Sequence, residues 1–485
     1  MNLFFSGHQE KYAVEQTLLT LFPQERPVYP TTPSGGDNEL CLSFSRGTTW
    51  ATARAVLRRD GQTYTRQCRV AVADLPPDDP VVTTRLTRRT LQRAFYLAAV
   101  DCLGAEPPWG MLSGVRPVKL PTRALEAGAT PRQAEAMLRD QYRVSPLRRR
   151  LAVDCAQASL AVKARLLPQE VSLYVGIPFC PTRCAYCSFI SSSGSANRLI
   201  PAYLDALDEE IDAAAAALRA AGRTVRTVYL GGGTPTTLDA PQLARLLDHL
   251  RTAFALDPRA EFTVEAGRPD TITREKLLAL RAGGANRISV NPQTMSDQVL
   301  AAIGRSHSAQ QIREAYALAR QVDVGAINMD LIAGLPADTL AGFRATVEEV
   351  IALDPENITV HTLALKRGAR LRQEDTPLPD GPTVAAMLDF AWDALDRAGY
   401  VPYYLYRQKF MSGGFENVGW CKPGWASEYN ICMMEELHTV LSLGAGGVTK
   451  FVGEGTVRRA ANPKYPQEYL RQLPQLRAEK AAWTW

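Results

Sequence analysis

Residues 173–189 read LYVGIPFCPTRCAYCSF and place three cysteines, Cys180, Cys184 and Cys187, directly after an apolar run. The spacing is C-x-x-x-C-x-x-C, so the three thiols can converge within one loop. Three thiolates can bind three irons of a cubane cluster and leave the fourth iron without a protein ligand. As at an open catalytic metal site, the missing ligand creates a place where a small molecule can coordinate. We therefore predict one 4Fe-4S cluster at this loop.

The alternatives for this loop are a structural zinc site and three unrelated thiols. Structural zinc takes four protein ligands, and the nearest histidines along the chain are His249 and His307. The remaining cysteines are scattered rather than arranged as a dense disulfide framework, so we expect most of them to be reduced thiols in the core. They are Cys41, Cys68, Cys102, Cys155, Cys421 and Cys432.

From about residue 171 to residue 400, short β-branched runs alternate with longer amphipathic patterns, which predicts strands alternating with helices. The predicted strands are residues 171–177, 224–230, 261–266, 286–290, 325–333 and 357–365. The predicted helices are residues 202–222, 240–254, 273–284, 308–321 and 339–353. This alternation indicates an α/β fold with a parallel sheet, as a full or partial (β/α) barrel. The ligand site is then expected at the C-terminal ends of the strands.

The length of 485 residues is too great for one small core, and we predict three domains. Residues 1–165 are expected to form an N-terminal α/β accessory domain, residues 166–400 the barrel, and residues 401–485 a small C-terminal α+β extension. The extension carries a short helix pattern around PQEYLRQLPQLRAEK.

The composition is that of a globular protein, with 46% hydrophobic and 22% charged residues. No apolar run approaches the roughly 20 residues that cross a bilayer, and the N-terminus lacks the features of a signal peptide, so we expect a cytoplasmic protein without a membrane partner. The net charge of +5 is mild. The basic stretches RPVKLPTR and RVSPLRRR contain few interleaved aromatics, which makes nucleic acid an unfavoured partner.

Polar and glycine residues near the predicted strand ends are candidates for a binding site. Gly231, Gly232 and Gly233 in YLGGGTPTTL would let the backbone approach a ligand that a side chain would block. Asp330 lies at the end of an otherwise apolar strand pattern, where a carboxylate is costly to bury unless it is paired. The other polar candidates are Glu265, Gln293 and Arg305.

The motif C-x-x-x-C-x-aromatic-C, with Tyr186 as the aromatic residue, resembles the signature of radical S-adenosylmethionine (SAM) enzymes. In that superfamily SAM binds the open iron through its amino and carboxylate groups, and an electron from the cluster cleaves it to methionine and a 5'-deoxyadenosyl radical. The resemblance implies a partial (β/α)6 barrel, one 4Fe-4S cluster and at least one SAM molecule.

A narrower resemblance covers residues 173–364. The motifs LYVGIPFCPTRCAYC, GGGTPTTL, NRISVNPQT, IGRSH and DLIAGLP, in this order, resemble the oxygen-independent coproporphyrinogen III oxidase family and its haem-chaperone relatives. The segments WGMLSGVRPVK, LGAGGVTK and ANPK extend the likeness over nearly the whole chain and resemble the coproporphyrinogen dehydrogenase branch called HemZ.

The resemblance assigns roles to individual residues. Those that fall where the family contacts the cluster-bound SAM are Tyr174, Tyr186, Gly232 and Glu265. Those that fall where the oxidase holds a second SAM are Gly233, Thr234, Gln293, Arg305, Asp330 and Ala364. The residues predicted to act in catalysis are Tyr174, Glu265 and Arg305, and the predicted metal ligands are Cys180, Cys184 and Cys187.

Two departures from the oxidase pattern concern the substrate rather than the cofactors. The oxidase has a further cysteine two residues past the third cluster cysteine, where this sequence has Phe189. The short N-terminal segment that helps to cover its substrate is replaced here by a much longer domain. Gly176, where the oxidase has histidine, suits the HemZ branch.

The resemblance implies oxidative decarboxylation of two propionates of coproporphyrinogen III to vinyl groups, which yields protoporphyrinogen IX in haem and porphyrin biosynthesis. It also implies an electron donor such as flavodoxin or ferredoxin. A substrate with four carboxylates needs cationic partners, and guanidinium groups suit them. The candidates are Arg367, Arg370, Arg407 and Lys409.

Two rival functions stay open. A haem-binding chaperone would keep the cluster and SAM but deliver haem, with His361, His438 or Cys421 as an axial ligand. A radical SAM enzyme acting on another tetrapyrrole, for example in haem ring opening, would differ in the mass of its product.

Overall fold

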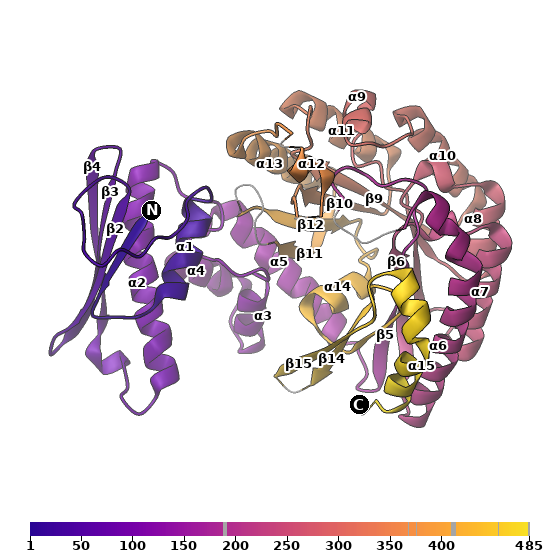
Figure 1. Cartoon of the computed structure of the whole chain (residues 1–485), viewed down its shortest axis with the longest axis horizontal. Helices are drawn as coiled ribbons and strands as arrows, with labels where there is room; N and C mark the ends of the chain where they lie inside the picture. Colours follow the sequence, from indigo (N-terminus) through magenta and orange to yellow (C-terminus); the bar gives the residue numbers. More distant parts are fainter. Residues whose placement is uncertain (188–191, 367, 375, 409–413, 454, 484–485) are drawn as a thin grey trace. The chain divides into compact units, whose positions relative to one another are not determined.

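The computed structural model describes residues 1–187, 192–366, 368–374, 376–408, 414–453 and 455–483. The chain divides into two units, each with its own sheet (Figure 1). The first unit comprises Met1–Pro117, Ala127–Arg150 and Ser412–Phe415, and the second comprises Val118–Glu126, Leu151–Met411 and Glu416–Trp485. The three domains expected from the sequence, with boundaries at residues 165 and 400, stay a prediction.

The first unit is built around a four-stranded sheet with the order β1-β2-β3-β4. Strand β1 pairs with β2 in parallel, and the other pairs are antiparallel. Along the first eight residues of β3, buried residues alternate with more exposed ones, as expected for a strand with one covered face. The helices and strands of this unit are β1 (Asn2–Ser6), α1 (Lys11–Leu21), β2 (Glu39–Arg46), β3 (Trp50–Arg59), β4 (Gln62–Ala71), α2 (Pro80–Leu103) and α4 (Pro131–Tyr142).

Helix α2 packs against β3 and β4. Asp79 begins the helix by accepting hydrogen bonds from the backbone N–H groups of Val81 and Val82, and Gly104 ends it in a left-handed conformation with φ 67°. The buried residues of α1, α2 and the sheet form one hydrophobic core. Its members include Val14, Leu18, Leu40, Leu42, Leu57, Leu91 and Phe95.

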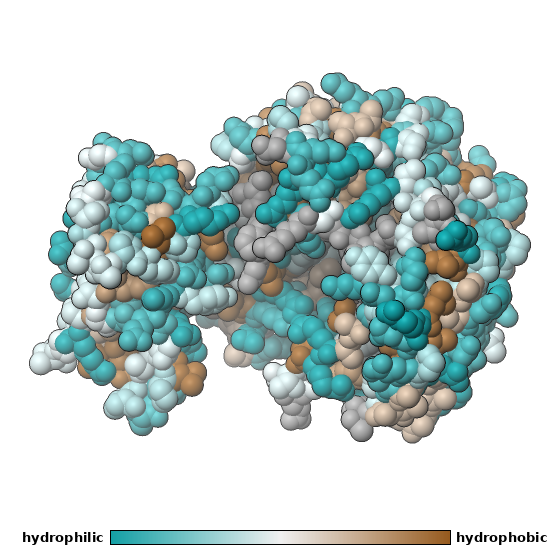
Figure 2. All heavy atoms as spheres, in the orientation of Figure 1, coloured by the Kyte–Doolittle hydropathy of each residue, from teal (hydrophilic) through white to brown (hydrophobic). Residues whose placement is uncertain are grey.

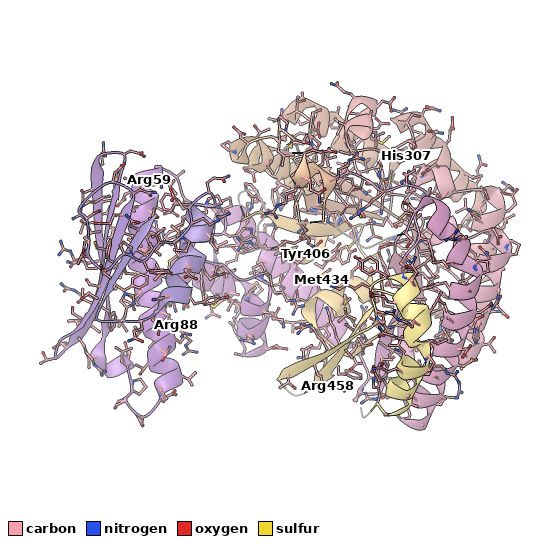
Figure 3. All side chains as sticks on the ribbon, viewed as in Figure 1. Arg59, Arg88, His307, Tyr406, Met434 and Arg458 are labelled. Carbon is pink, nitrogen blue, oxygen red and sulfur yellow. The ribbon has the colours of Figure 1, made fainter. Side chains whose placement is uncertain are left out.

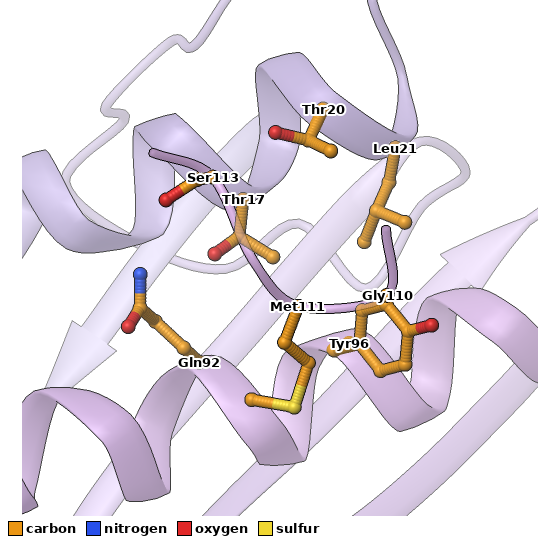
Figure 4. Close-up of a pocket in the computed structure, with 8 residues that line it drawn as sticks. All are labelled: Thr17, Thr20, Leu21, Gln92, Tyr96, Gly110, Met111 and Ser113. Atoms are coloured by element: carbon orange, nitrogen blue, oxygen red, sulfur yellow. The ribbon is translucent and has the colours of Figure 1, made fainter. Parts of the chain in front are cut away.

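The WGMLS segment of the first unit is held against the end of α4. The backbone N–H of Met111 donates to the carbonyl of Tyr142 at 2.8 Å. Gly110 has φ 52°, and a Cβ at this position would lie 2.1 Å from the Tyr142 carbonyl oxygen, so this close approach requires glycine. The segment, α1 and α2 border a small pocket (Figure 4). Its lining residues are Thr17, Thr20, Leu21, Gln92, Tyr96, Gly110, Met111 and Ser113.

The second unit is built around an open sheet with the order β11-β12-β10-β9-β8-β7-β6-β5-β13-β14-β15. Strands β5 to β10 are neighbours in chain order and pair in parallel, and at least one α-helix connects each to the next. This arrangement is the six-stranded partial (β/α) barrel, with β11 and β15 as the two edges of the sheet. The six strands are β5 (Glu170–Ile177), β6 (Thr224–Gly232), β7 (Glu261–Glu265), β8 (Arg287–Ser289), β9 (Ala326–Ala333) and β10 (Asn357–Thr362).

The connecting helices lie on the outer side of these strands, as Figure 1 shows for α6, α7, α8 and α10. Polar N-cap residues begin several of them, and Asp239 and Ser308 form capping boxes with the third residue of their helices. The apolar faces recur at helical spacing and are buried. The helices are α6 (Ile200–Ala220), α7 (Ala240–Ala253), α8 (Arg274–Ala282), α9 (Asp297–Ala302), α10 (Ala309–Val322) and α11 (Leu340–Leu353).

The chain after β10 extends the sheet at both ends. Strands β11 and β12 continue it antiparallel beside β10, and β13 pairs in parallel with β5 before β14 and β15. The C-terminal helix α15 packs on α6 and is the terminal helix that the sequence pattern predicts. These elements are α12 (Arg370–Gln373), α13 (Gly381–Arg397), β11 (Val401–Arg407), β12 (Glu416–Cys421), α14 (Glu428–Glu435), β13 (Val440–Leu443), β14 (Val448–Gly453), β15 (Thr456–Ala461) and α15 (Pro466–Ala481). Helices α3 (Lys119–Glu126) and α5 (Pro146–Lys163) precede the barrel.

The predicted α/β fold is confirmed, because every predicted strand and helix of the barrel overlaps one that the structure contains. One detail differs: Asp330 lies inside β9 and not at its end. Among the described residues, no helix is long and apolar enough to cross a bilayer. Figure 2 shows hydrophilic side chains over most of the visible surface, with hydrophobic residues singly or in small groups.

Candidate functional site

The three-cysteine loop begins directly after β5, at the C-terminal end of the first barrel strand. Cys180, Cys184 and Cys187 form no disulfide and are half-buried. The Sγ atom of Cys180 lies 3.5 Å from Oγ1 of Thr234, which follows the next strand, β6. The loop therefore presents the Cys180 thiol beside the end of β6.

Arg305 holds the second half of this loop. Its Nη2 donates to the hydroxyl of Tyr186 at 3.1 Å, and its Nη1 donates to the carbonyl of Asn291 at 2.9 Å. Although burial alone would lower the pKa of Arg305, the neighbouring Tyr186 and Cys184 raise it, so the guanidinium stays charged. Burial raises the pKa of the Tyr186 hydroxyl, which stays protonated. The two residues thus form a charged, hydrogen-bonded contact beside the cysteines.

The three glycines at the end of β6 leave no room for side chains. A Cβ on Gly233 would lie 2.5 Å from the carbonyl oxygen of Phe179, and one on Gly231 would lie 3.0 Å from the Glu265 carboxyl group. Gly232 has φ 107°, a conformation that L side chains rarely adopt, and a Cβ there would lie 3.1 Å from the hydroxyl of Tyr174. The bare backbone of these residues therefore borders Tyr174 and Glu265.

Glu265 ends β7 and accepts a 2.6 Å hydrogen bond from the hydroxyl of Tyr229 on β6. Burial raises the pKa of Glu265 to about 7, and the charge of Asp330 adds to this effect, while hydrogen bonds from Tyr229 and the Gly232 backbone partly offset it. Sequence reasoning missed Tyr229. The signal was available in the period of two along β6, which places Tyr229 on the same face as Gly231.

Aromatic rings line the barrel interior below the glycines. The ring of Tyr229 stacks on that of Tyr174 at 6.3 Å and on that of Tyr429 at 4.5 Å between centroids. Tyr429 comes from α14, far along the chain, and the sequence offers no local pattern that pairs it with Tyr229. Burial raises the pKa of Tyr174 and of Tyr229, so both stay neutral phenols.

A backbone hydrogen bond joins Gln293, which follows β8, to Asp330 on β9. The backbone N–H of Gln293 donates to the carbonyl of Asp330 at 2.9 Å, and Gln293 is buried with φ 67°. Nε2 of His361 on β10 lies 3.8 Å from Oδ2 of Asp330, and the amide of Asn328 donates to Oδ1 at 2.8 Å. Burial favours a higher pKa for Asp330, but His361 and Asn328 outweigh it and lower the pKa.

The remaining predicted residues lie around the ends of β10 and β11. Ala364 follows β10 and is half-buried. Arg407 ends β11, is 7% exposed, and has a pKa lowered to about 10 by burial. Arg370 is exposed and pairs with Glu374 at 3.2 Å. The predicted residues that lie outside the described part of the chain are Phe189, Arg367 and Lys409.

Two of the three candidate haem ligands are buried away from the cysteine loop. Nε2 of His438 lies 2.7 Å from Oγ of Ser172, a residue near the start of β5, and burial lowers the pKa of His438 to about 4. Cys421 is buried in a cluster with Tyr403 and Cys432. Of the three candidates, His361 alone is close to Asp330, and it lies near the C-terminal end of its strand, β10.

These residues fit a 4Fe-4S cluster with SAM. The donor set is three cysteines on one loop, none of them in a disulfide, which suits a cubane cluster with an open iron. In the described part of the chain no three His, Cys, Asp or Glu side chains, the three cysteines included, are grouped to hold a single metal ion. Gly231, Gly232 and Gly233, which we call the glycine edge, present bare backbone where a Cβ would clash with neighbouring residues. Near it, the buried hydroxyls of Thr263 and Ser289 have no partner among the described residues and can serve a polar ligand.

Comparison with known proteins agrees with this geometry. Residues 174–350 match the model of the radical SAM superfamily. The chain is 39% identical over 386 residues to the oxygen-independent coproporphyrinogen-III oxidase-like protein HemZ of Bacillus subtilis, which covers 78% of this chain and 77% of that protein. It is 28% identical over 302 residues to the heme chaperone HemW of Escherichia coli, covering 62% of this chain and 76% of that protein.

A solved structure shows the same fold. Coproporphyrinogen III oxidase (HemN) from Escherichia coli, described as a radical SAM enzyme, superposes with a TM-score of 0.54 at 28% identity. The match covers 66% of this chain and 72% of that chain. The cysteine loop and glycine edge lie within the residues that match the superfamily model. The chain therefore belongs to the radical SAM superfamily and, within it, to the oxygen-independent coproporphyrinogen III oxidase family that includes HemZ.

Proposed function

We propose that this chain is an oxygen-independent coproporphyrinogen III dehydrogenase, which decarboxylates two propionates to vinyl groups and yields protoporphyrinogen IX. One observation carries the proposal. Three cysteine thiols, the glycine edge and the carboxyl group of Glu265 lie at the C-terminal ends of the adjacent strands β5, β6 and β7. The similarity to HemZ and to the HemN structure supports the choice of a tetrapyrrole substrate.

The cofactors would be held by the residues that the structure brings together. Cys180, Cys184 and Cys187 would bind the cluster, and Gly232 and Glu265 would accept hydrogen bonds from the amino group of SAM. When bound, these groups supply a one-electron reductive cleavage and a radical that removes hydrogen atoms from carbon. The other proposed cofactor-binding residues, including those for a second SAM, are Tyr174, Tyr186, Gly233, Thr234, Gln293, Arg305, Asp330 and Ala364.

The protein itself would orient the substrate and keep out water. Arg407 ends the edge strand β11 and is buried, and a buried guanidinium can pair with a substrate carboxylate more strongly than it can in water. Tyr406, on β11 (Figure 3), is half-buried and can stack on a pyrrole ring of the substrate. We assign Tyr174, Glu265 and Arg305 to catalysis, because they border the glycine edge and the cysteine loop. A small protein such as flavodoxin or ferredoxin would supply the electron.

The decisive experiment incubates anaerobically reconstituted full-length protein with SAM, a reductant and coproporphyrinogen III. We expect 5'-deoxyadenosine and, by mass spectrometry, a product that has lost two carboxyl groups. Cys184→Ala should abolish both products, because a cubane site with two thiolates binds the cluster poorly. Cys68→Ala, at a half-buried cysteine of the first unit, is the matched control and should keep activity. Turnover by Cys184→Ala would contradict the proposal.

A second candidate function is haem delivery, and the position of His361 favours it. This histidine is 25% exposed, lies near the C-terminal end of β10 and pairs with Asp330 inside β9, a position where it could bind haem iron. The same preparation titrated with haem separates the two functions. A haem spectrum that His361→Ala removes, together with no decarboxylated product, would favour the chaperone over the dehydrogenase.

A further inference from the structure

Arg268 connects the loop after β7 to the cysteine loop. The residue is 3% exposed. Its Nη1 donates to the carbonyl oxygen of Thr182 at 3.1 Å and to the Thr182 hydroxyl at 2.7 Å. Its Nε and Nη2 donate to the two carboxylate oxygens of Asp270 at 3.0 and 3.1 Å. One buried guanidinium thus makes four hydrogen bonds, two of them to a residue between Cys180 and Cys184.

The position of Thr182 makes this contact relevant to the thiols. Thr182 stands two residues after Cys180 and two before Cys184, and its own side chain is exposed. The other half of the loop is fixed separately, because the N–H of Ala185 donates to the carbonyl of Ile303 at 2.9 Å and Arg305 donates to Tyr186. Arg268 therefore acts on the half of the loop that carries the first two cysteines.

The partner of Arg268 keeps the guanidinium in a single orientation. Asp270 binds it in the bidentate geometry that arginine offers and lysine does not. Nδ1 of His307 lies 3.7 Å from Oδ1 of Asp270 and further limits the movement of the carboxylate. A buried, paired charge of this kind gives conformational specificity more readily than net stability. The arrangement is therefore suited to setting a loop geometry.

We propose that Arg268 is a positioning residue of the cysteine loop: held by Asp270, it fixes Thr182 and thereby the spacing of the Cys180 and Cys184 thiols before the cluster binds. This inference rests on the proposed function, in which these cysteines hold the cluster. It adds a residue whose hydrogen bonds go to Thr182 and Asp270. Groups that orient metal ligands in this way typically change metal affinity or activity about 10- to 100-fold when they are replaced.

The test compares reconstituted full-length variants by the rate at which a chelator removes iron, and by the electron paramagnetic resonance spectrum of the reduced cluster with and without SAM. Arg268→Gln is expected to lose iron about 10- to 100-fold faster and to alter the SAM-induced spectral change. Thr182→Val removes one hydrogen bond to a charged group and should accelerate iron loss by about tenfold. The rate of iron loss from Arg268→Lys should lie between the rates of Arg268→Gln and the wild type.

The matched control is Arg259→Gln. Arg259 makes the same bidentate pair with a carboxylate two residues away, Asp257, but its side chain is 90% exposed and has no contact with the loop among the described residues. The rate of iron loss and the spectra of Arg259→Gln should equal those of the wild type. The double variant Arg268→Gln/Thr182→Val should lose iron no faster than Arg268→Gln alone, because both changes remove the same contact.

Iron loss and spectra like those of the wild type in Arg268→Gln, or additive effects in the double variant, would overturn the inference. If Arg268→Gln does not fold, Thr182→Val decides alone, since an exposed threonine in a loop can be replaced without disturbing a core; a wild-type rate for it overturns the inference. The proposed function fails separately, because a wild-type protein that binds no iron and sulfide would be seen before any variant is compared.

Discussion

Glu265 shows how strongly the environment of one residue can change its chemistry. Burial is the main cause that raises its pKa to about 7, and the nearby charge of Asp330 adds to it. The unfolded chain has no such environment, so there Glu265 has the ordinary pKa of 4.5. Between pH 4.5 and 7 the folded state holds more protons than the unfolded state, and the free energy of unfolding falls as pH rises.

The pH dependence gives a prediction for Glu265→Gln. Glutamine stays neutral, so the variant should avoid the loss of stability that the wild type suffers on going from pH 4 to pH 8. Relative to the wild type, its free energy of unfolding should increase by about 1–3 kcal/mol over this range. Urea unfolding of the cofactor-free protein at both pH values measures the change. Glu479→Gln, at an exposed position on α15, is the control, and a pH-independent difference for Glu265→Gln would contradict the prediction.

At the scale of elements, the carboxylate of Glu261 holds the N-terminus of helix α14 against the barrel. Oε1 of Glu261, the first residue of β7, accepts hydrogen bonds from the hydroxyl of Ser427 and the N–H of Tyr429, and Oε2 accepts one from the N–H of Glu428. A negative charge at a helix N-terminus is favourable. This contact also holds Tyr429 against Tyr229, which donates to Glu265.

Glu261→Gln should therefore loosen α14. The amide replaces one oxygen with a donor that faces a backbone N–H group, so we expect a loss of about 1–3 kcal/mol in the free energy of unfolding. Asp380→Asn, at the exposed N-cap of α13, retains the accepting oxygen and should cost less than about 0.5 kcal/mol. Denaturant unfolding of both variants measures the difference, and equal losses would argue against the role of Glu261.

At the scale of the whole second unit, two helices distant in sequence share a buried ion pair. Nζ of Lys480 on α15 lies 2.5 Å from Oε1 of Glu210 on α6, and both side chains are almost fully buried. Oε2 of Glu210 also accepts hydrogen bonds from the hydroxyl of Tyr469 and the N–H of Gly444. The network ties the C-terminal helix to the turn after β13, beside β5.

Replacing Lys480 with methionine should leave Glu210 without its charge partner. We expect a loss of about 3–5 kcal/mol in the free energy of unfolding. The same two helices offer a matched control, because Arg477 and Glu209 form an exposed pair, with each side chain 51% exposed. Arg477→Met should cost less than about 1 kcal/mol. Denaturant titrations compare the two, and similar losses would show that burial does not set the energy of the Lys480 pair.

Much of the second unit could be predicted because its signals are local. The period of apolar residues identified the strands and helices from β5 to β10, and the spacing of Cys180, Cys184 and Cys187 pointed to a cluster. The candidate site could be predicted in part, because parallel strands bring their C-terminal ends to one edge of a sheet. The first unit was expected only as an α/β region, because its strand order depends on contacts between distant segments.

The amino-acid sequence alone determined the α/β alternation, the cysteine loop and the glycine edge, since each depends on residues close together in the chain. Only the tertiary structure decided that Tyr229 donates to Glu265, that Arg268 holds Thr182, and that Lys480 pairs with Glu210. The physical reason is that helix and strand periods depend on neighbouring residues, whereas a hydrogen-bond partner depends on the register and packing of elements that the chain brings together from far apart.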